Sequence, residues 1–207
     1  MKRSKITILL AIVLGMTFHS CLDLEPQDQL GGKNMWTSVN DYKQFANTFY
    51  SWTRDFSSVV YDGTHSDKRS DLITYQSYNE FSRGINSIPS SDANYTDNYK
   101  HIRRTNLLLQ NAEAYAKPED IKQYIGEAYF FRAYSYFDLL QLYGDVIITK
   151  KPLDITDPEM KVKRNDRSEV VDLIIDDLNH AVENLPAFKE LTTEEEGRIS
   201  KEGAQAF

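Results

Sequence analysis

The segment 119–143 constrains the fold of this chain more than any other part. Its apolar residues recur every three or four positions and form a helical stripe: Ile121, Tyr124, Ile125, Ala128, Phe131, Ser135, Leu139 and Leu142. Four more aromatic residues widen the stripe: Tyr129, Phe130, Tyr136 and Phe137. A helix with so wide an apolar face needs neighbours on two sides. The segment therefore predicts a core helix, with Pro118 before it and Gly144 as a left-handed cap after it.

Shorter helical patterns of the same period flank this core segment, at 39–50, 97–116, 168–184 and from Ser200 to Phe207. Side chains suited to capping stand at their starts: Ser38 or Asn40, Asp97, Ser168 and Ser200. Between these patterns, 53–96 is polar and aperiodic, and 145–167 reads as extended. The sequence thus predicts helices separated by one long irregular loop and one extended segment.

Antiparallel helix pairs account for these patterns best. Small Ala128 and Ala133 would let a neighbouring helix approach the core helix, and Tyr129 and Phe137 would fill its grooves. We therefore expect an all-α, tetratricopeptide-like α-solenoid, although the helix pairs do not recur at the strict spacing of about 34 residues.

A secretory signal precedes the single cysteine of the chain, Cys21. Basic residues at positions 2, 3 and 5 lead into the apolar segment 6–18, which is too short to span a bilayer, and small Ser20 stands just before the cysteine. This order is typical of a lipoprotein signal, with 1–20 removed and Cys21 acylated. The polar residues 21–35 would then form a tether. The alternative is a plain signal peptide with an incidental thiol.

The charge balance excludes a nucleic-acid binder. Cleavage before Cys21 would change the formal net charge from −7 to −10, because 1–20 holds three basic residues and no acidic one. A nucleic-acid interface needs a basic face instead.

We find no catalytic or metal-binding pattern in the sequence. His65, His101 and His180 have no partners at metal-ligand spacing, and a single cysteine excludes a thiolate zinc site, so neither metal nor cofactor is expected. Asp176 and Asp177 point in different directions on a helix and cannot form a glycosidase pair. For Arg132 we expect a carboxylate or a helix C-terminus as the partner.

Several ordered blocks resemble the SusD/RagB family of outer-membrane nutrient-binding lipoproteins from Bacteroidetes. The most specific block is Gly126-Glu-Ala-Tyr-Phe-Phe-Arg-Ala-Tyr-Ser-Tyr-Phe-Asp-Leu-Leu-Gln-Leu-Tyr-Gly-Asp-Val146. The others are the cysteine block at 20–26, an aromatic-x-x-x-Tyr-x-x-Ile-x-x-x-Asn pattern at 95–106, and blocks at 167–171, 177–186 and 197–201. Together they span nearly the whole chain.

This resemblance implies a SusD-like N-terminal helical domain over 36–207 that does not catalyse. It implies a surface-exposed lipoprotein, anchored in the outer membrane through Cys21, that captures an oligosaccharide or peptide and delivers it to a SusC-type TonB-dependent transporter. It also implies that Tyr95 and Asn98 contact the ligand, at the end of the polar loop and just before the next helix. Family members are more than twice as long, so we expect this chain to be an N-terminal part.

Two other functions stay open at this stage. A helical-repeat scaffold that binds only proteins would show the same periodicity. An enzyme is the third possibility, although no reactive constellation supports it. For Tyr95 and Asn98, the alternative to ligand contact is a structural role at the start of a helix.

Overall fold

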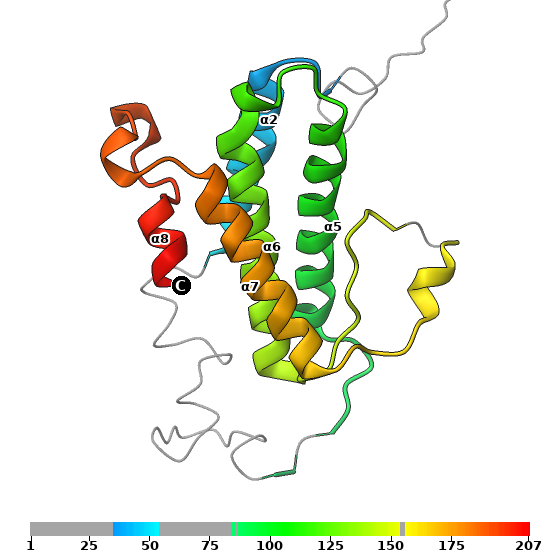
Figure 1. Ribbon diagram of the computed structural model, residues 1–207. Coiled ribbons are helices and arrows are strands. Elements are labelled where there is room, and N and C mark those ends of the chain that lie inside the picture. Colours follow the sequence, from blue (N-terminus) through cyan, green and yellow to red (C-terminus); the bar gives the residue numbers. More distant parts are fainter. Residues whose placement is uncertain (1–34, 54–83, 86, 154–155) are drawn as a thin grey trace, which may run out of the picture. The chain divides into compact units, whose positions relative to one another are not determined.

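The computed structural model describes residues 35–53, 84–85, 87–153 and 156–207 (Figure 1). The chain divides into a short unit, Met1–Met35, and a second unit, Trp36–Phe207, to which nearly all described residues belong. The predicted signal peptide, Cys21 and the tether up to residue 34 lie outside the described residues. So do His65 and most of the predicted polar loop, at 54–83.

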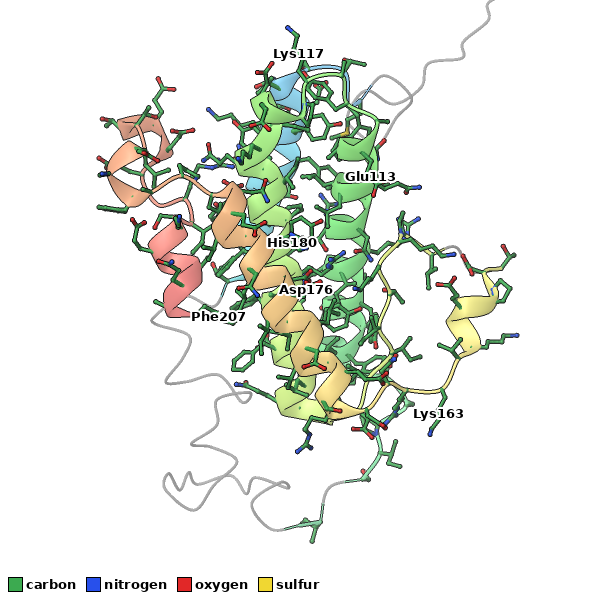
Figure 2. The ribbon with its side chains drawn as sticks, viewed as in Figure 1. Glu113, Lys117, Lys163, Asp176, His180 and Phe207 are labelled. Carbon is green, nitrogen blue, oxygen red and sulfur yellow. The ribbon has the colours of Figure 1, made fainter. Side chains whose placement is uncertain are left out.

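Three long helices form the body of the second unit. Helix α6, Lys122–Tyr143, packs against α5, Ala93–Glu113, and against α7, Arg167–Asn184. Successive helices run antiparallel, and the turn between Glu113 and Lys117 lies at one end of α5 and α6 (Figure 2). The predicted core helix is therefore confirmed, with partners on two sides.

Shorter elements complete the unit. Helix α2, Val39–Asn47, and the 3₁₀-helix η1, Thr48–Trp52, continue one another, and α2 also packs on α5 and α6. Helix α8, Lys201–Ala206, packs on α7. Four more 3₁₀ turns lie between the helices: η3, Pro118–Ile121; η4, Pro158–Lys161; η5, Phe188–Glu190; and η6, Thr193–Glu195.

The predicted all-α, tetratricopeptide-like fold is confirmed. Among the described residues, β-structure is limited to one isolated antiparallel bridge between Val146 and Asn165. In that same part of the chain, no helix has both the length and the apolar character needed to cross a membrane.

Buried apolar side chains form the core where α5, α6 and α7 meet. Its fully or nearly fully buried members are Ile102, Ala133, Tyr136, Leu139, Val146, Val170, Leu173 and Ile174. Aromatic rings extend this packing between α2, η1 and α6, where Phe49 lies 5.7 Å from both Phe45 and Phe131. Ala128 and Ala133 are fully buried, as expected for close helix contact.

Helix α5 begins four residues before its predicted start. Asp92, not Asp97, is the N-cap: its Oδ1 accepts from the backbone N–H of Asn94 at 2.9 Å. Its Oδ2 accepts from the hydroxyl of Tyr143 at 2.6 Å. Because Tyr143 lies 51 residues further along the chain, a local pattern could not identify this cap.

Three other local predictions need correction. Helix α7 is capped by Asp166, whose backbone N–H donates to Glu169 Oε2 at 2.9 Å, so Ser168 lies inside the helix. Gly144 ends α6 with φ 71° as predicted, but its ψ of −107° lies outside the left-handed helical region. Phe137 does not fill a buried groove, because 36% of it is exposed and its ring packs on Phe207.

Candidate functional site

A cleft of about 410 Å³ opens between the first half of α5 and the extended segment that follows α6. Figure 1 shows this segment running alongside α5. Helix α5 contributes Tyr95, Thr96, Tyr99, Lys100 and Arg103. The opposite side is lined by Ile147, Thr149, Lys151 and Leu153, together with Glu159 of η4. We call residues 147–153 the cleft wall.

Two tyrosines give the cleft an aromatic floor. The ring of Tyr95 lies 4.8 Å from that of Tyr99 and 5.2 Å from that of Tyr143, so three rings support one another. Tyr95 is half-buried, which leaves part of its ring open to the cleft. Burial raises the pKa of the Tyr99 hydroxyl, which accepts from the N–H of Ile147 and donates to its carbonyl, both at 2.9 Å.

The cleft wall is held by side chains of α5 and α6 rather than by a neighbouring strand. Tyr99 binds the backbone of Ile147. Tyr136 accepts from the N–H of Thr149 at 2.8 Å, and Asn106 donates to the carbonyls of Thr149 and Lys151 at 2.9 and 3.3 Å. Arg103 Nε donates to the carbonyl of Leu153 at 3.2 Å. Every second residue of the wall is therefore fixed, and the same four residues line the cleft.

Charged side chains surround the aromatic floor. Lys100 pairs with Asp97 at 2.8 Å, and Lys151 pairs with Glu159 at 2.7 Å. These lysines are more than half exposed, and their ammonium groups can donate several hydrogen bonds. Aromatic faces beside exposed donors match the two faces of a sugar ring, one of C–H groups and one of hydroxyl oxygens.

The two ligand-contact residues predicted from sequence are placed differently. Both lie inside α5 rather than before it, since the helix starts at Ala93. Tyr95 lines the cleft, but Asn98 does not; it is 8% exposed and donates to the carbonyl of Asn94 at 2.9 Å. The other α5 residues of the cleft were not singled out from sequence. Their spacing was a signal, because Tyr95, Tyr99 and Arg103 recur every four positions along one helix face.

The remaining residues considered for chemistry have structural partners. Arg132 forms a buried pair with Asp177, as predicted for a carboxylate partner. Asp176 points outward and lies 3.8 Å from His180, near it on α7 in Figure 2. His101 stacks on Trp52 with ring centroids 4.1 Å apart. No group of three or more potential metal ligands occurs in the part of the chain described here.

Comparison with known proteins supports a single family. The SusD-like family model described as "Starch-binding associating with outer membrane" matches residues 22–207. Two curated relatives from Formosa agariphila are similar: SusD-like protein P38, 28% identical over 204 residues, and SusD-like protein P2, 27% identical over 203. The matches cover 89% and 90% of this chain but 38% and 39% of the relatives, so the chain spans about two fifths of their length.

Solved structures share the fold. A SusD-like protein from Bacteroides fragilis aligns with a TM-score of 0.69 at 24% identity, over 87% of this chain and 36% of that one. A second B. fragilis structure, titled a SusD-like carbohydrate-binding protein, aligns at 0.66 and 20% identity, over 83% and 36%. A structure titled laminarin-binding SusD-like protein aligns at 0.62 and 24% identity, over 81% and 38%.

Proposed function

The chain belongs to the SusD-like family, and on that basis we propose that it serves as a cell-surface lipoprotein that captures a nutrient in the α5 cleft. The nutrient is an oligosaccharide or a peptide, with a glycan favoured by the family's description and by the laminarin-binding structural relative. The protein hands its cargo to a SusC-type TonB-dependent transporter, and no chemical step occurs. The anchor is acylated Cys21 in the outer membrane.

The observation that carries this proposal is the supported, partly open ring of Tyr95 at the floor of the cleft. Stacking of a sugar ring needs a flat apolar face that is already fixed, because a mobile ring loses conformational entropy on binding. Tyr99 and Tyr143 hold the Tyr95 ring from two sides. Thr96, Lys100 and Lys151 stand around it and can bond to hydroxyl groups.

Asn98 is the second proposed contact residue. The carbonyl of Asn94 occupies one of its amide donors, which leaves its oxygen and its second N–H for a ligand. An equally concrete role is to hold the first turns of α5, on which Tyr95 stands. The two roles predict different results for substitution.

The test is a binding titration of the mature chain carrying Cys21→Ala, which keeps it free of lipid. Laminarihexaose and maltohexaose represent the two glycan classes, and an unstructured tryptic peptide mixture represents peptides. Tyr95→Ala should weaken binding of the glycan that scores by about fivefold to fiftyfold, which corresponds to ~1–2 kcal/mol of stacking. Tyr95→Phe keeps the ring and should retain most of the affinity.

Asn98→Ala separates the two roles of that residue. Loss of affinity with an unchanged melting temperature supports ligand contact, whereas a lower melting temperature with parallel loss supports the structural role. If the Cys21→Ala chain binds neither glycan nor peptide, capture in this cleft is wrong. The scaffold alternative then gains weight, since Phe137, Ile175 and Phe207 expose apolar surface on α6, α7 and α8.

A further inference from the structure

Three buried polar side chains, one from each long helix, lead from the far side of the bundle to the cleft wall. Asp177 of α7 accepts from Arg132 Nε and Nη2 at 2.8 and 2.6 Å. Arg132 of α6 donates from Nη1 to Asn106 Oδ1 at 2.7 Å. Asn106 of α5 donates from Nδ2 to the carbonyls of Thr149 and Lys151. All three side chains are nearly or fully buried, with exposures of 0%, 5% and 1%.

The direction of each hydrogen bond in this series is fixed by chemistry. Guanidinium groups only donate, so the amide oxygen of Asn106 must face Arg132. The amide nitrogen of Asn106 then faces the opposite way, toward two carbonyl oxygens that only accept. Asp177 fixes the plane of the guanidinium by a bidentate contact, which allows little rotation. A residue on α7 therefore determines where a donor on α5 points.

We propose that Asn106 is a positioning residue for the ligand cleft, aimed at the wall by Arg132 and Asp177. It touches no ligand itself. By fixing the carbonyls of Thr149 and Lys151, it sets how far the wall stands from Tyr95 and Tyr99 across the cleft. The ligand part of this inference rests on the proposed function, but the control of the wall does not.

The placement of the other wall contacts makes Asn106 decisive at the middle of the wall. Tyr99 holds the wall at Ile147 and Arg103 holds it at Leu153. Between them, the carbonyl of Lys151 has Asn106 as its bonding partner, and Thr149 shares Asn106 with Tyr136. Losing the Asn106 amide should therefore loosen the middle of the wall while its ends stay attached.

Hydrogen–deuterium exchange of the wall amides tests the inference without any ligand, on the mature chain with Cys21→Ala. Asn106→Asp is the main variant, because it keeps the side-chain volume and an acceptor for Arg132 but removes the NH₂ group that holds the wall. Asn106→Ala is the second variant. Asn111→Ala is the matched control on the same helix, since its amide donates only to the carbonyl of Leu107 among the described partners, at 2.7 Å.

Both Asn106 variants should speed exchange across 147–153 by about tenfold, the change expected for loss of ~1.4 kcal/mol of local stability. The Asn111→Ala control should not change it. Wall exchange in Asn106→Asp equal to that of the unaltered chain would overturn the inference, whatever the result for Asn106→Ala.

Titration with laminarihexaose and maltohexaose then tests the link to the ligand. Weakening by Asn106→Asp of about tenfold, with Asn111→Ala unchanged, supports the positioning role. A faster wall with unchanged affinity overturns that role and leaves the proposed function standing. If the unaltered chain binds neither glycan, the proposed glycan capture fails, and the exchange measurement alone decides whether Asn106 holds the wall.

Discussion

Arg132 and Asp177 form a bidentate ion pair that joins α6 to α7 inside the core, with the two shortest N–O distances at 2.6 and 2.8 Å. Burial would lower the pKa of Arg132, but the carboxylate of Asp177 outweighs it, so the pKa is raised and the guanidinium stays charged. The ring of Tyr129 lies 5.3 Å from the same guanidinium. This arrangement satisfies a charge that would otherwise be expensive to bury.

Asp177→Asn should therefore lower the free energy of unfolding by about 3–5 kcal/mol, because it leaves the buried guanidinium without a counter-charge. The matched control is Asp176→Asn, since Asp176 is the neighbouring carboxylate on the same helix but is more than half exposed. That change should cost less than about 1 kcal/mol. Urea denaturation of both variants measures the difference, and similar midpoints for the two would contradict the assignment.

Elements with a strong local signal were predictable from the sequence. The apolar stripe of α6 gave its bounds to within a few residues, and Ser38 and Ser200 cap α2 and α8 as expected. The need of Arg132 for a carboxylate also follows from its place on an apolar helix. These predictions rest on periodicity and on local capping chemistry, which a single sequence contains.

Features set by distant partners were not predictable in the same way. The start of α5 depends on the bond from Tyr143 to Asp92, and the choice of Asp177 over Asp176 depends on how α7 docks. The cleft wall carries no helix or strand pattern, because side chains of α5 hold it from 43 to 50 residues away. Tyr95 was found as one cleft residue, but the wall that faces it was not.

Gly126 marks the closest approach of α6 to the end of α7. A Cβ placed there would lie 2.9 Å from Leu185 Cγ, 3.0 Å from Leu185 N and 3.1 Å from Asn184 Cβ. Two of these atoms belong to or adjoin the backbone of the α7 C-terminus, which cannot move without breaking the bond from Leu185 N–H to the carbonyl of Ala181.

Gly126→Ala should thus destabilise the fold by about 1–3 kcal/mol, the usual cost of overpacking, although alanine is the better helix former. Gly203→Ala in α8 is the control, because the nearest atom to a Cβ there is the flexible end of Ile199. Thermal melting measures both. A Gly126→Ala protein as stable as the parent would show that α7 can shift to make room.

Lipidation at Cys21 remains a prediction from the sequence. The signal at 1–20, small Ser20 and the acidic residues Asp23 and Glu25 together predict acylation and export to the cell surface. Metabolic labelling with a palmitate analogue should mark the wild type and not Cys21→Ala; equal label in both would sink the prediction. Protease added to intact cells should digest the wild-type protein. Protection until lysis would instead place it on the periplasmic side.

His101 should make the stability of the fold depend on pH below neutrality. It stacks on Trp52 with ring planes 13° apart, and burial lowers its pKa from 6.5 to about 4. Asp97 works against this shift, whereas Arg104 and Lys100 add to it. Because the unfolded chain takes up the proton more readily than the folded one, the contribution of His101 is complete above pH 6.5. It is lost as the pH falls toward 4.

Between pH 7 and pH 5 the loss should be about 1 kcal/mol, after a discount for the partial exposure of the ring. His101→Phe keeps a flat ring on Trp52 and removes the titration, so its stability should fall less over the same interval. Carboxylates that titrate in this range are common to both proteins and cancel in the difference between their profiles. Urea denaturation at several pH values gives the two curves. Parallel curves would mean that the His101 ring accepts its proton as easily in the folded protein as in the unfolded chain.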